Sequence, residues 1–231
     1  MSKRRKRWVE GPWGCRPMPE DVKRGDLRYM NEFVRLRCAP DLLTLGLFPN
    51  MKEVTESFAA YSAVREWHPP LSDPSIKMVA IGDGTKPRTA STFAFRSAWE
   101  CYSVDPELQL SWKWRQVARL HVIPTLIEDF HLESDSPVVI VAVHSHASLA
   151  TAVASVDAPV KMVVAIPCCK SQALDREPDF IYTDPGIWSA KNEIHGWFLT
   201  DAAEWNGRPR RAHNPEIAGS TPVAATSGAL A

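Results

Sequence analysis

The sequence has no net charge, no long apolar run and few cysteines, and each absence excludes a class of protein. The 27 basic residues balance the 27 acidic ones, so the whole chain has no electrostatic attraction for nucleic acid or for a membrane. No apolar stretch approaches the ~20 residues of a membrane span, and no apolar segment follows the basic start as in a signal peptide. Five cysteines, an odd number, do not suggest a disulfide framework. These absences predict a reduced, cytoplasmic protein with no membrane partner.

The remaining composition divides the chain into three regions. With 45% hydrophobic residues among 231, the chain can bury the core of one main domain. Residues 1–74 begin as a basic, irregular segment and continue as a helical extension, because apolar residues have helical spacing in 26–36 and 52–67. Residues 75–207 alternate short apolar runs with helix-compatible segments, which predicts the main domain. Residues 208–231 lack apolar periodicity and are predicted to be a disordered tail.

Both ends of the chain have unusual compositions. Residues 3–7 are all lysine or arginine, which is compatible with a solvated, disordered tip or with an arm that contacts phosphates. Residues 8–19 are rich in Pro, Gly and Trp and are expected to be irregular. Residues 218–223 can be back-translated into a sequence that resembles the T arm of a transfer RNA gene. The tail can therefore be interpreted as read-through into such a gene, as in a mobile or viral genome.

The most informative segment runs from residue 78 to residue 105. A short apolar run breaks at Gly82-Asp83-Gly84, a helix-compatible stretch follows, and a second short apolar run ends at Asp105. This order predicts a strand, a glycine turn, a helix and a second strand. The glycines let the backbone approach a ligand, and the helix N-terminus lies beside it. Asp105 can accept hydrogen bonds from both ribose hydroxyls, so we interpret the segment as a nucleotide site.

The same residues have plainer interpretations. The third glycine of the dinucleotide fingerprint is missing, so the glycine pattern alone also fits an ordinary turn. Asp105 could simply cap the end of its strand, with Pro106 starting a turn. Lys86 and Arg88, in the glycine loop, could meet an anionic group or remain solvated. The spacing from glycines to acid, together with the strand–helix alternation on both sides, favours the site.

Further strands are predicted after Asp105, each followed by polar or reactive residues. Residues 120–127 are predicted to form a third strand, which ends at Glu128-Asp129. Residues 138–143 form a continuous β-branched run, typical of a strand buried on both faces of a parallel sheet, and residues 160–166 are predicted to form another buried strand. They end at His144-Ser-His-Ala and at Pro167-Cys-Cys, and segments 180–182 and 193–199 could add an antiparallel pair. The pattern predicts an α/β fold with a doubly wound, mostly parallel sheet that binds ligands outside its strand ends.

Taken together, these motifs resemble S-adenosylmethionine-dependent methyltransferases of the seven-strand Rossmann-like class. The resemblance covers about residues 76–199. Within the class it is similar to a branch whose fourth strand ends in a His-x-His/Cys-Ala motif and whose fifth ends in Cys-Cys. The family's first motif has more glycines and an acid just before them, whereas here Asp83 lies between two glycines.

The resemblance implies S-adenosylmethionine as cofactor and assigns roles to particular residues. The implied cofactor-binding residues are Gly82, Asp83, Gly84, Asp105, Glu128 and Asp129. Residues 144–147 would border the point of methyl transfer, where His144 or His146 could serve as the base. Pro167, Cys168 and Cys169 would line the substrate pocket. The family does not identify the acceptor, and we expect RNA or protein in preference to a small molecule.

Two other functions stay open at this point. One is a non-catalytic Rossmann-like module that binds nucleic acid or a protein. The other is an NAD-dependent oxidoreductase on a similar fold, which the missing third glycine disfavours. The oligomeric state is not predicted.

The histidines and cysteines at the strand ends also have alternative roles. Cys168 and Cys169 could be small buried hydrophobic residues, since a thiolate role needs a lowered pKa. His144 and His146 are two apart on a strand end and are expected to point the same way. With the cysteines they could form a mixed His/Cys metal site. No spaced C-x-x-C or H-x-x-x-H pair is present, so we predict no metal.

Overall fold

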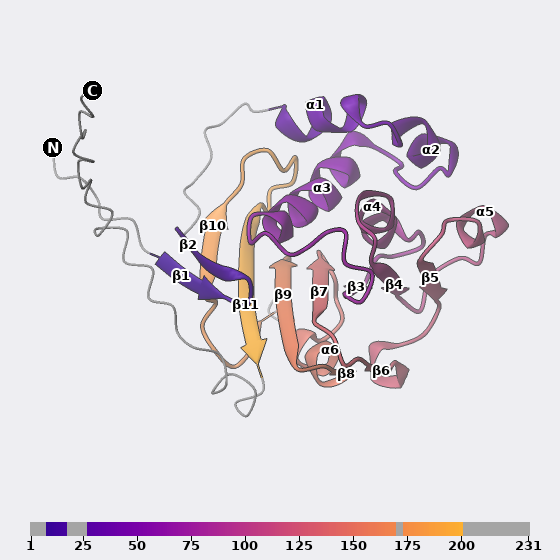
Figure 1. Cartoon of the computed structure of the whole chain (residues 1–231). Helices are drawn as coiled ribbons and strands as arrows, with labels where there is room; N and C mark the ends of the chain where they lie inside the picture. Colours follow the sequence, from indigo (N-terminus) through magenta and orange to yellow (C-terminus); the bar gives the residue numbers. More distant parts are fainter. Residues whose placement is uncertain (1–7, 18–26, 170–172, 201–231) are drawn as a thin grey trace, which may run out of the picture. The chain divides into compact units, whose positions relative to one another are not determined.

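The computed structural model describes residues 8–17, 27–169 and 173–200 (Figure 1). The chain divides into two units, residues 1–201 and residues 202–231, and the second contains no described residue. The basic start at 3–7 and the predicted tail at 208–231 therefore lie outside the described residues. Within the described ranges, no helix is both long and apolar enough to cross a membrane.

Seven strands form the central sheet, in the order β10-β11-β9-β7-β3-β4-β5 (Figure 1). All neighbours from β9 to β5 pair in parallel, and β11 is antiparallel to both β9 and β10. The prediction of an α/β fold with a mostly parallel sheet is confirmed. The strands are β3 (Lys77–Ile81), β4 (Glu100–Val104), β5 (Leu120–Ile123), β7 (Val138–Val143), β9 (Val160–Ile166), β10 (Phe180–Thr183) and β11 (Glu193–Thr200).

The direction of winding reverses between β3 and β7. From β3 the chain passes outward through β4 to β5, and it then returns to β7 on the other side of β3. Ile81 at the end of β3 pairs with Val104 on β4 and with Ala142 on β7, so the three strands end at about the same level. In open α/β sheets, ligands bind in the crevice outside the strand ends at such a reversal.

Apolar side chains cover both faces of the sheet. Alternate residues of one strand enter opposite cores: Met78 and Ala80 pack against the helices that precede and follow β3, while Val79 and Ile81 pack toward α6. The helices are α1 (Arg28–Arg35), α2 (Ala39–Thr44), α3 (Met51–Arg65), α4 (Arg88–Arg96), α5 (Trp112–Arg115) and α6 (Leu149–Ala154), with a short 3-10 turn η1 (Ile127–Asp129). Burial on both faces explains why the strand sequences are continuous apolar runs.

Two predictions about local structure need correction. The segment 8–19, expected to be irregular, contains a hairpin of β1 (Trp8–Gly11) and β2 (Gly14–Pro17). Gly14, with φ of +122°, permits its tight turn. The strand predicted over 120–127 ends at Ile123, because Pro124 has no N–H to continue the ladder. A further small pair joins β6 (Leu132–Glu133) and β8 (Val156–Asp157) in parallel.

Helix α3 lies in the region predicted as a helical extension, and it contacts β7 and β9 of the sheet. The side chain of Asn50 accepts a hydrogen bond from the Glu53 N–H (3.1 Å) and so caps its N-terminus. Unusually for a helix beside an apolar sheet, α3 buries polar side chains, among them Thr55, Glu56 and Ser57. The boundary predicted at residue 74 stays a prediction.

Candidate functional site

A cavity of about 700 Å³ lies at the C-terminal ends of β3, β4 and β7. A volume of this size is typical of small-molecule sites, which measure about 300–1,000 Å³. Seven of the residues singled out in the sequence line it: Gly82, Asp83, Gly84, Asp105, Glu128, His144 and His146. Four others do not line it: Asp129, Pro167, Cys168 and Cys169. Helix α3 contributes residues that sequence reasoning missed, Lys52, Glu53, Glu56 and Ser57.

The turn after β3 requires both of its glycines. Gly82 and Gly84 have φ of +67° and +72°, in the left-handed region that side chains with a Cβ avoid. A Cβ on Gly82 would lie 2.2 Å from the Oγ of Ser145, so the glycine also lets the turn approach the loop after β7. The two glycines thus expose backbone, and no side chain, to the floor of the cavity.

Asp83 lies between these glycines and caps helix α4. Its carboxylate accepts hydrogen bonds from the N–H groups of Thr89 (2.9 Å) and Ala90 (3.1 Å) and from the hydroxyl of Ser103 (2.9 Å). Pro87, at the N-cap position, makes no side-chain capping bond, so Asp83 supplies the cap from the preceding turn. The carboxylate therefore occupies the amides that a phosphate would take at a helix N-terminus.

Asp105, at the end of β4, joins the glycine turn to its own strand. Its Oδ2 accepts a hydrogen bond from the Gly84 N–H (2.9 Å), and its Oδ1 accepts one from the Glu107 N–H (2.7 Å). The second bond is the turn-capping role considered as the plainer interpretation. A carboxylate has about four acceptor sites, so each oxygen retains capacity for a further donor. The acid is thereby held in a fixed orientation at the cavity wall.

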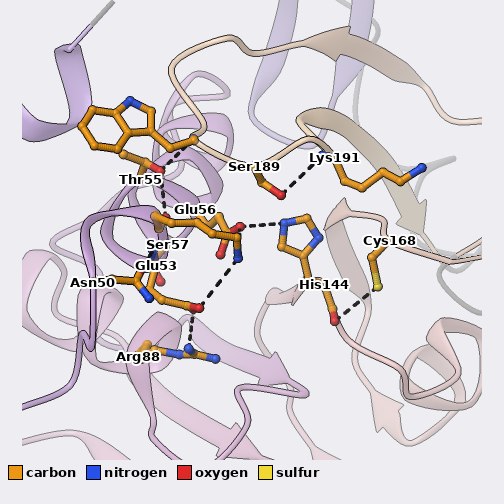
Figure 2. Close-up of polar contacts among 12 residues, drawn as sticks. Asn50, Glu53, Thr55, Glu56, Ser57, Arg88, His144, Cys168, Ser189 and Lys191 are labelled. Atoms are coloured by element: carbon orange, nitrogen blue, oxygen red, sulfur yellow. Dashed lines mark hydrogen bonds and ion pairs between the residues drawn. The ribbon is translucent and has the colours of Figure 1, made fainter.

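His144 is held by helix α3. Its Nε2 lies 2.9 Å from the Oε1 of Glu56 (Figure 2). The same oxygen lies 2.8 Å from the Nζ of Lys52. Burial by itself would raise the pKa of Glu56, but His144 and Lys52 outweigh it and hold that pKa below the ordinary value. Glu56 is therefore a buried, charged group facing an imidazole at the cavity.

The basic residues near the glycine turn are already paired within the protein. Arg88 forms an ion pair with Glu53 (Figure 2). It also donates from Nη2 to the carbonyl oxygen of Asp83 (2.8 Å). Lys86 donates to the carbonyl oxygen of Gly46 (2.5 Å). Arg88 is thus paired with a carboxylate, whereas Lys86 bonds a neutral carbonyl oxygen and does not line the cavity.

The expectation that His144 and His146 point the same way is wrong. Alternation of side chains applies to extended residues, but β7 ends at Val143 and His144 has φ of +49°. His144 turns to Glu56, whereas a ring nitrogen of His146 lies within 4.8 Å of the sulfur atoms of Cys168 and Cys169. The two histidines therefore belong to different clusters.

The strand ends of β7 and β9 lie side by side, as their neighbouring positions require. Val143 pairs with Ile166, and the His144 N–H donates to the carbonyl oxygen of Ile166 (3.0 Å). The thiol of Cys168 donates to the carbonyl oxygen of His144 (3.4 Å) (Figure 2). The cysteines thus lie behind the His144 loop, beside the cavity and not on its surface.

No signal in the sequence separates the site residues of α3 from a solvated helix face. Lys52, Glu53 and Glu56 are the residues that an exposed helix surface ordinarily carries. A scan of the chain against protein-family models gives no match, and no curated protein matches it at a significant level. The chemistry of the cavity is therefore the ground on which a function can be assigned.

Proposed function

We propose that this protein is an S-adenosylmethionine-dependent methyltransferase with a doubly wound sheet, and that the cavity binds the cofactor. Three features at the reversal of the sheet support this: the cavity, the glycine turn and the acid bonded to that turn. Asp105 would accept hydrogen bonds from the ribose hydroxyls through its remaining lone pairs. Glu128, in the 3-10 turn η1 that follows β5, would lie on the adenine side.

The capping of α4 by Asp83 is the observation that carries the proposal. Dinucleotides place their pyrophosphate on the amides of the helix that follows the first strand. Here Asp83 accepts from those amides and adds a negative charge at the same place. An NAD-type cofactor would find the amides that bind its pyrophosphate already occupied, and the carboxylate of Asp83 would repel that pyrophosphate. S-adenosylmethionine has no phosphate, so neither obstacle applies to it.

The charge of the cavity also favours a cationic ligand. Among the described residues that line it, six are acidic and two are lysine or arginine. S-adenosylmethionine carries a sulfonium and an ammonium group against one carboxylate. Opposite charges attract more strongly in a partly enclosed cavity than in bulk water, because the effective dielectric is lower. The same excess of acid would repel the pyrophosphate of NAD.

For the reaction, the residues of the chain provide positioning and a base. When bound, the cofactor supplies a methyl group on a positively charged sulfur, a reactive donor that needs little further activation. Glu56 would orient the imidazole of His144, and the Nδ1 of His144 has no hydrogen-bond partner among the described residues. That nitrogen is buried in this structure, so it would accept the proton of an acceptor group once the side chains that cover it move aside. Glu56 is thus a positioning residue and His144 the proposed base.

Calorimetric titration with S-adenosylmethionine, S-adenosylhomocysteine and NAD tests the proposal. We expect the first two to bind and NAD not to bind. Asp105→Asn should weaken binding by about 1.5–3 kcal/mol, roughly tenfold to a hundredfold, because a charged acceptor of the ribose is lost. Asp135→Asn is the matched control, since Asp135 is exposed and does not line the cavity.

The other outcomes decide between the alternatives. Binding of NAD alone would support the oxidoreductase. Binding of none of the three would support a module without a cofactor, with RNA or protein as its partner. Equal affinity of Asp105→Asn and the unmodified protein would remove Asp105 from the site. Because Asp105 also holds the Gly84 and Glu107 amides, thermal melting of each variant must accompany the titration.

A further inference from the structure

A cluster of three metal-binding side chains lies where β7 and β9 end. The imidazole of His146 and the thiols of Cys168 and Cys169 present donor atoms that all lie within 4.8 Å of one another. In a tetrahedral zinc site with bonds of about 2.0–2.3 Å, neighbouring ligand atoms are about 3.5–3.8 Å apart. The three donors therefore need to approach one another by about 1 Å or less to share one ion.

We propose that His146, Cys168 and Cys169 form a zinc site with three protein ligands and an open fourth position. One imidazole and two thiolates are ligands that zinc prefers, and three protein ligands with a free position are the arrangement of catalytic zinc. This proposal does not depend on the identity of the nucleotide cofactor. It assigns the two histidines after β7 to separate tasks.

The backbone explains how two adjacent cysteines can face one ion. Successive residues of a strand point to opposite sides, but β9 ends at Ile166, and the chain bends at both cysteines. The Sγ atoms of Cys168 and Cys169 lie 3.8 and 3.7 Å from the same acceptor, the carbonyl oxygen of Ser145. Both thiols are therefore directed to one side, toward the loop that carries His146.

The present contacts of the thiols would be easy to exchange for metal bonds. Thiols are weak hydrogen-bond donors, and the sulfur–oxygen distances here are 3.4 to 3.8 Å. A dication would supply the positive charge that two adjacent metal-bound thiolates need.

The site would border the cavity, because His146 lines that cavity while the cysteines lie behind it. The open position is suited to a water molecule or to a sulfur or nitrogen atom of a second ligand. Zinc lowers the pKa of such a bound group, as it does that of water. The cluster would thus bring a Lewis acid to the wall of the cavity.

Cobalt(II) substitution tests the site directly. The full-length protein is reduced, freed of metal with a chelator and titrated with Co²⁺, followed by competition with Zn²⁺. One equivalent should produce a thiolate-to-cobalt charge-transfer band and the intense visible bands of tetrahedral cobalt, and Zn²⁺ should abolish both. Cys168→Ser, Cys169→Ser and His146→Ala should each weaken binding by roughly tenfold or more. Cys15→Ser and His131→Ala, outside the cluster, should leave it unchanged.

A second measurement uses only the unmodified protein, so it does not depend on whether the variants fold. Zn²⁺ should protect Cys168 and Cys169 of the unmodified protein from alkylation, as read by peptide mass spectrometry, and should not protect Cys15. Absence of the charge-transfer band, equal alkylation with and without Zn²⁺, or loss of the band in Cys15→Ser would each overturn the proposal. A disulfide between the two cysteines that persists under reducing conditions would overturn it as well. None of these readouts depends on binding of a nucleotide.

Discussion

At the residue scale, the candidate site is built from side chains that satisfy one another before any ligand arrives. Asp83 accepts hydrogen bonds from two amides of the helix it caps and from Ser103, and Asp105 is held by two backbone amides. Glu56 is 2% exposed and is matched by His144 and Lys52. Such preorganisation holds functional groups in place at little cost when a ligand binds.

The charge of Glu56 should make stability depend on pH. Its pKa is lowered in the folded state from the ordinary 4.5, so its ion pairs stabilise the fold above that pH. This contribution is lost as the pH falls through the folded-state value. Glu56→Gln should cost about 1.5–3 kcal/mol at neutral pH, because His144 and Lys52 lose a charged partner.

Denaturant unfolding at neutral pH and at a pH well below 4.5 measures this dependence. The difference in unfolding free energy between Glu56→Gln and the unmodified protein should shrink on acidification. Glu133→Gln is the control, because that carboxylate is exposed. A constant difference at both pH values would show that the ionised form of Glu56 contributes nothing.

At the scale of single elements, the glycine turn is the part of the fold with the least freedom to vary. It must adopt left-handed backbone, cap α4 through Asp83, and pass against the loop after β7. These demands explain why the first motif has its acid between two glycines. The acid, Asp83, caps helix α4, and the glycines allow the turn to lie close to the loop after β7.

Gly82→Ala should therefore be costlier than an ordinary glycine substitution. Its Cβ would enforce left-handed strain, about 1–2 kcal/mol, and would also collide with Ser145, adding about 1–3 kcal/mol. Gly46→Ala is a matched control: Gly46 has φ of +65°, and a Cβ there meets nothing within 4 Å. The difference between the two variants in urea unfolding isolates the steric term. Equal destabilisation of the two variants would show that the side chain of Ser145 can move away from the added Cβ with no loss of stability.

At the scale of the whole molecule, one sheet divides the described part of the chain into two apolar cores. Helix α3 belongs to one of these cores, and it also supplies Lys52 and Glu56 to the cavity. The region before residue 74 thus contributes to the site. Truncation at that predicted boundary would remove the partner of His144.

The opposite end should tolerate truncation. Residues 208–231 have no amphipathic pattern, and residues 218–223 can be back-translated into a sequence that resembles the T arm of a transfer RNA gene. A chain that ends at residue 207 should keep the melting temperature and the cofactor affinity of the full protein. A loss of several degrees in the melting temperature would show that the tail stabilises the domain, and would argue against read-through.

The sequence by itself determined the features that arise from local pattern. Runs rich in apolar residues identified β7 and β9 to the residue, because strands buried on both faces are mostly apolar on both sides. The glycines and Asp105 were recognisable from their spacing along one strand–helix–strand unit. Patterns of this kind depend only on residues that are close in the sequence, so they can be recognised without a structure.

Only the tertiary structure decided which side chains meet. Glu56 reaches His144 because α3 packs across β7, a contact between segments far apart in the sequence. Because His144 has a left-handed backbone, the two histidines point to different clusters. The alternation of side chains along an extended strand does not predict this, since it applies only to extended residues. The carboxylate of Asp83 turns to α4 because exposed amides there compete for it. Each outcome depends on packing and on competition for hydrogen bonds, which exist only once the chain has folded.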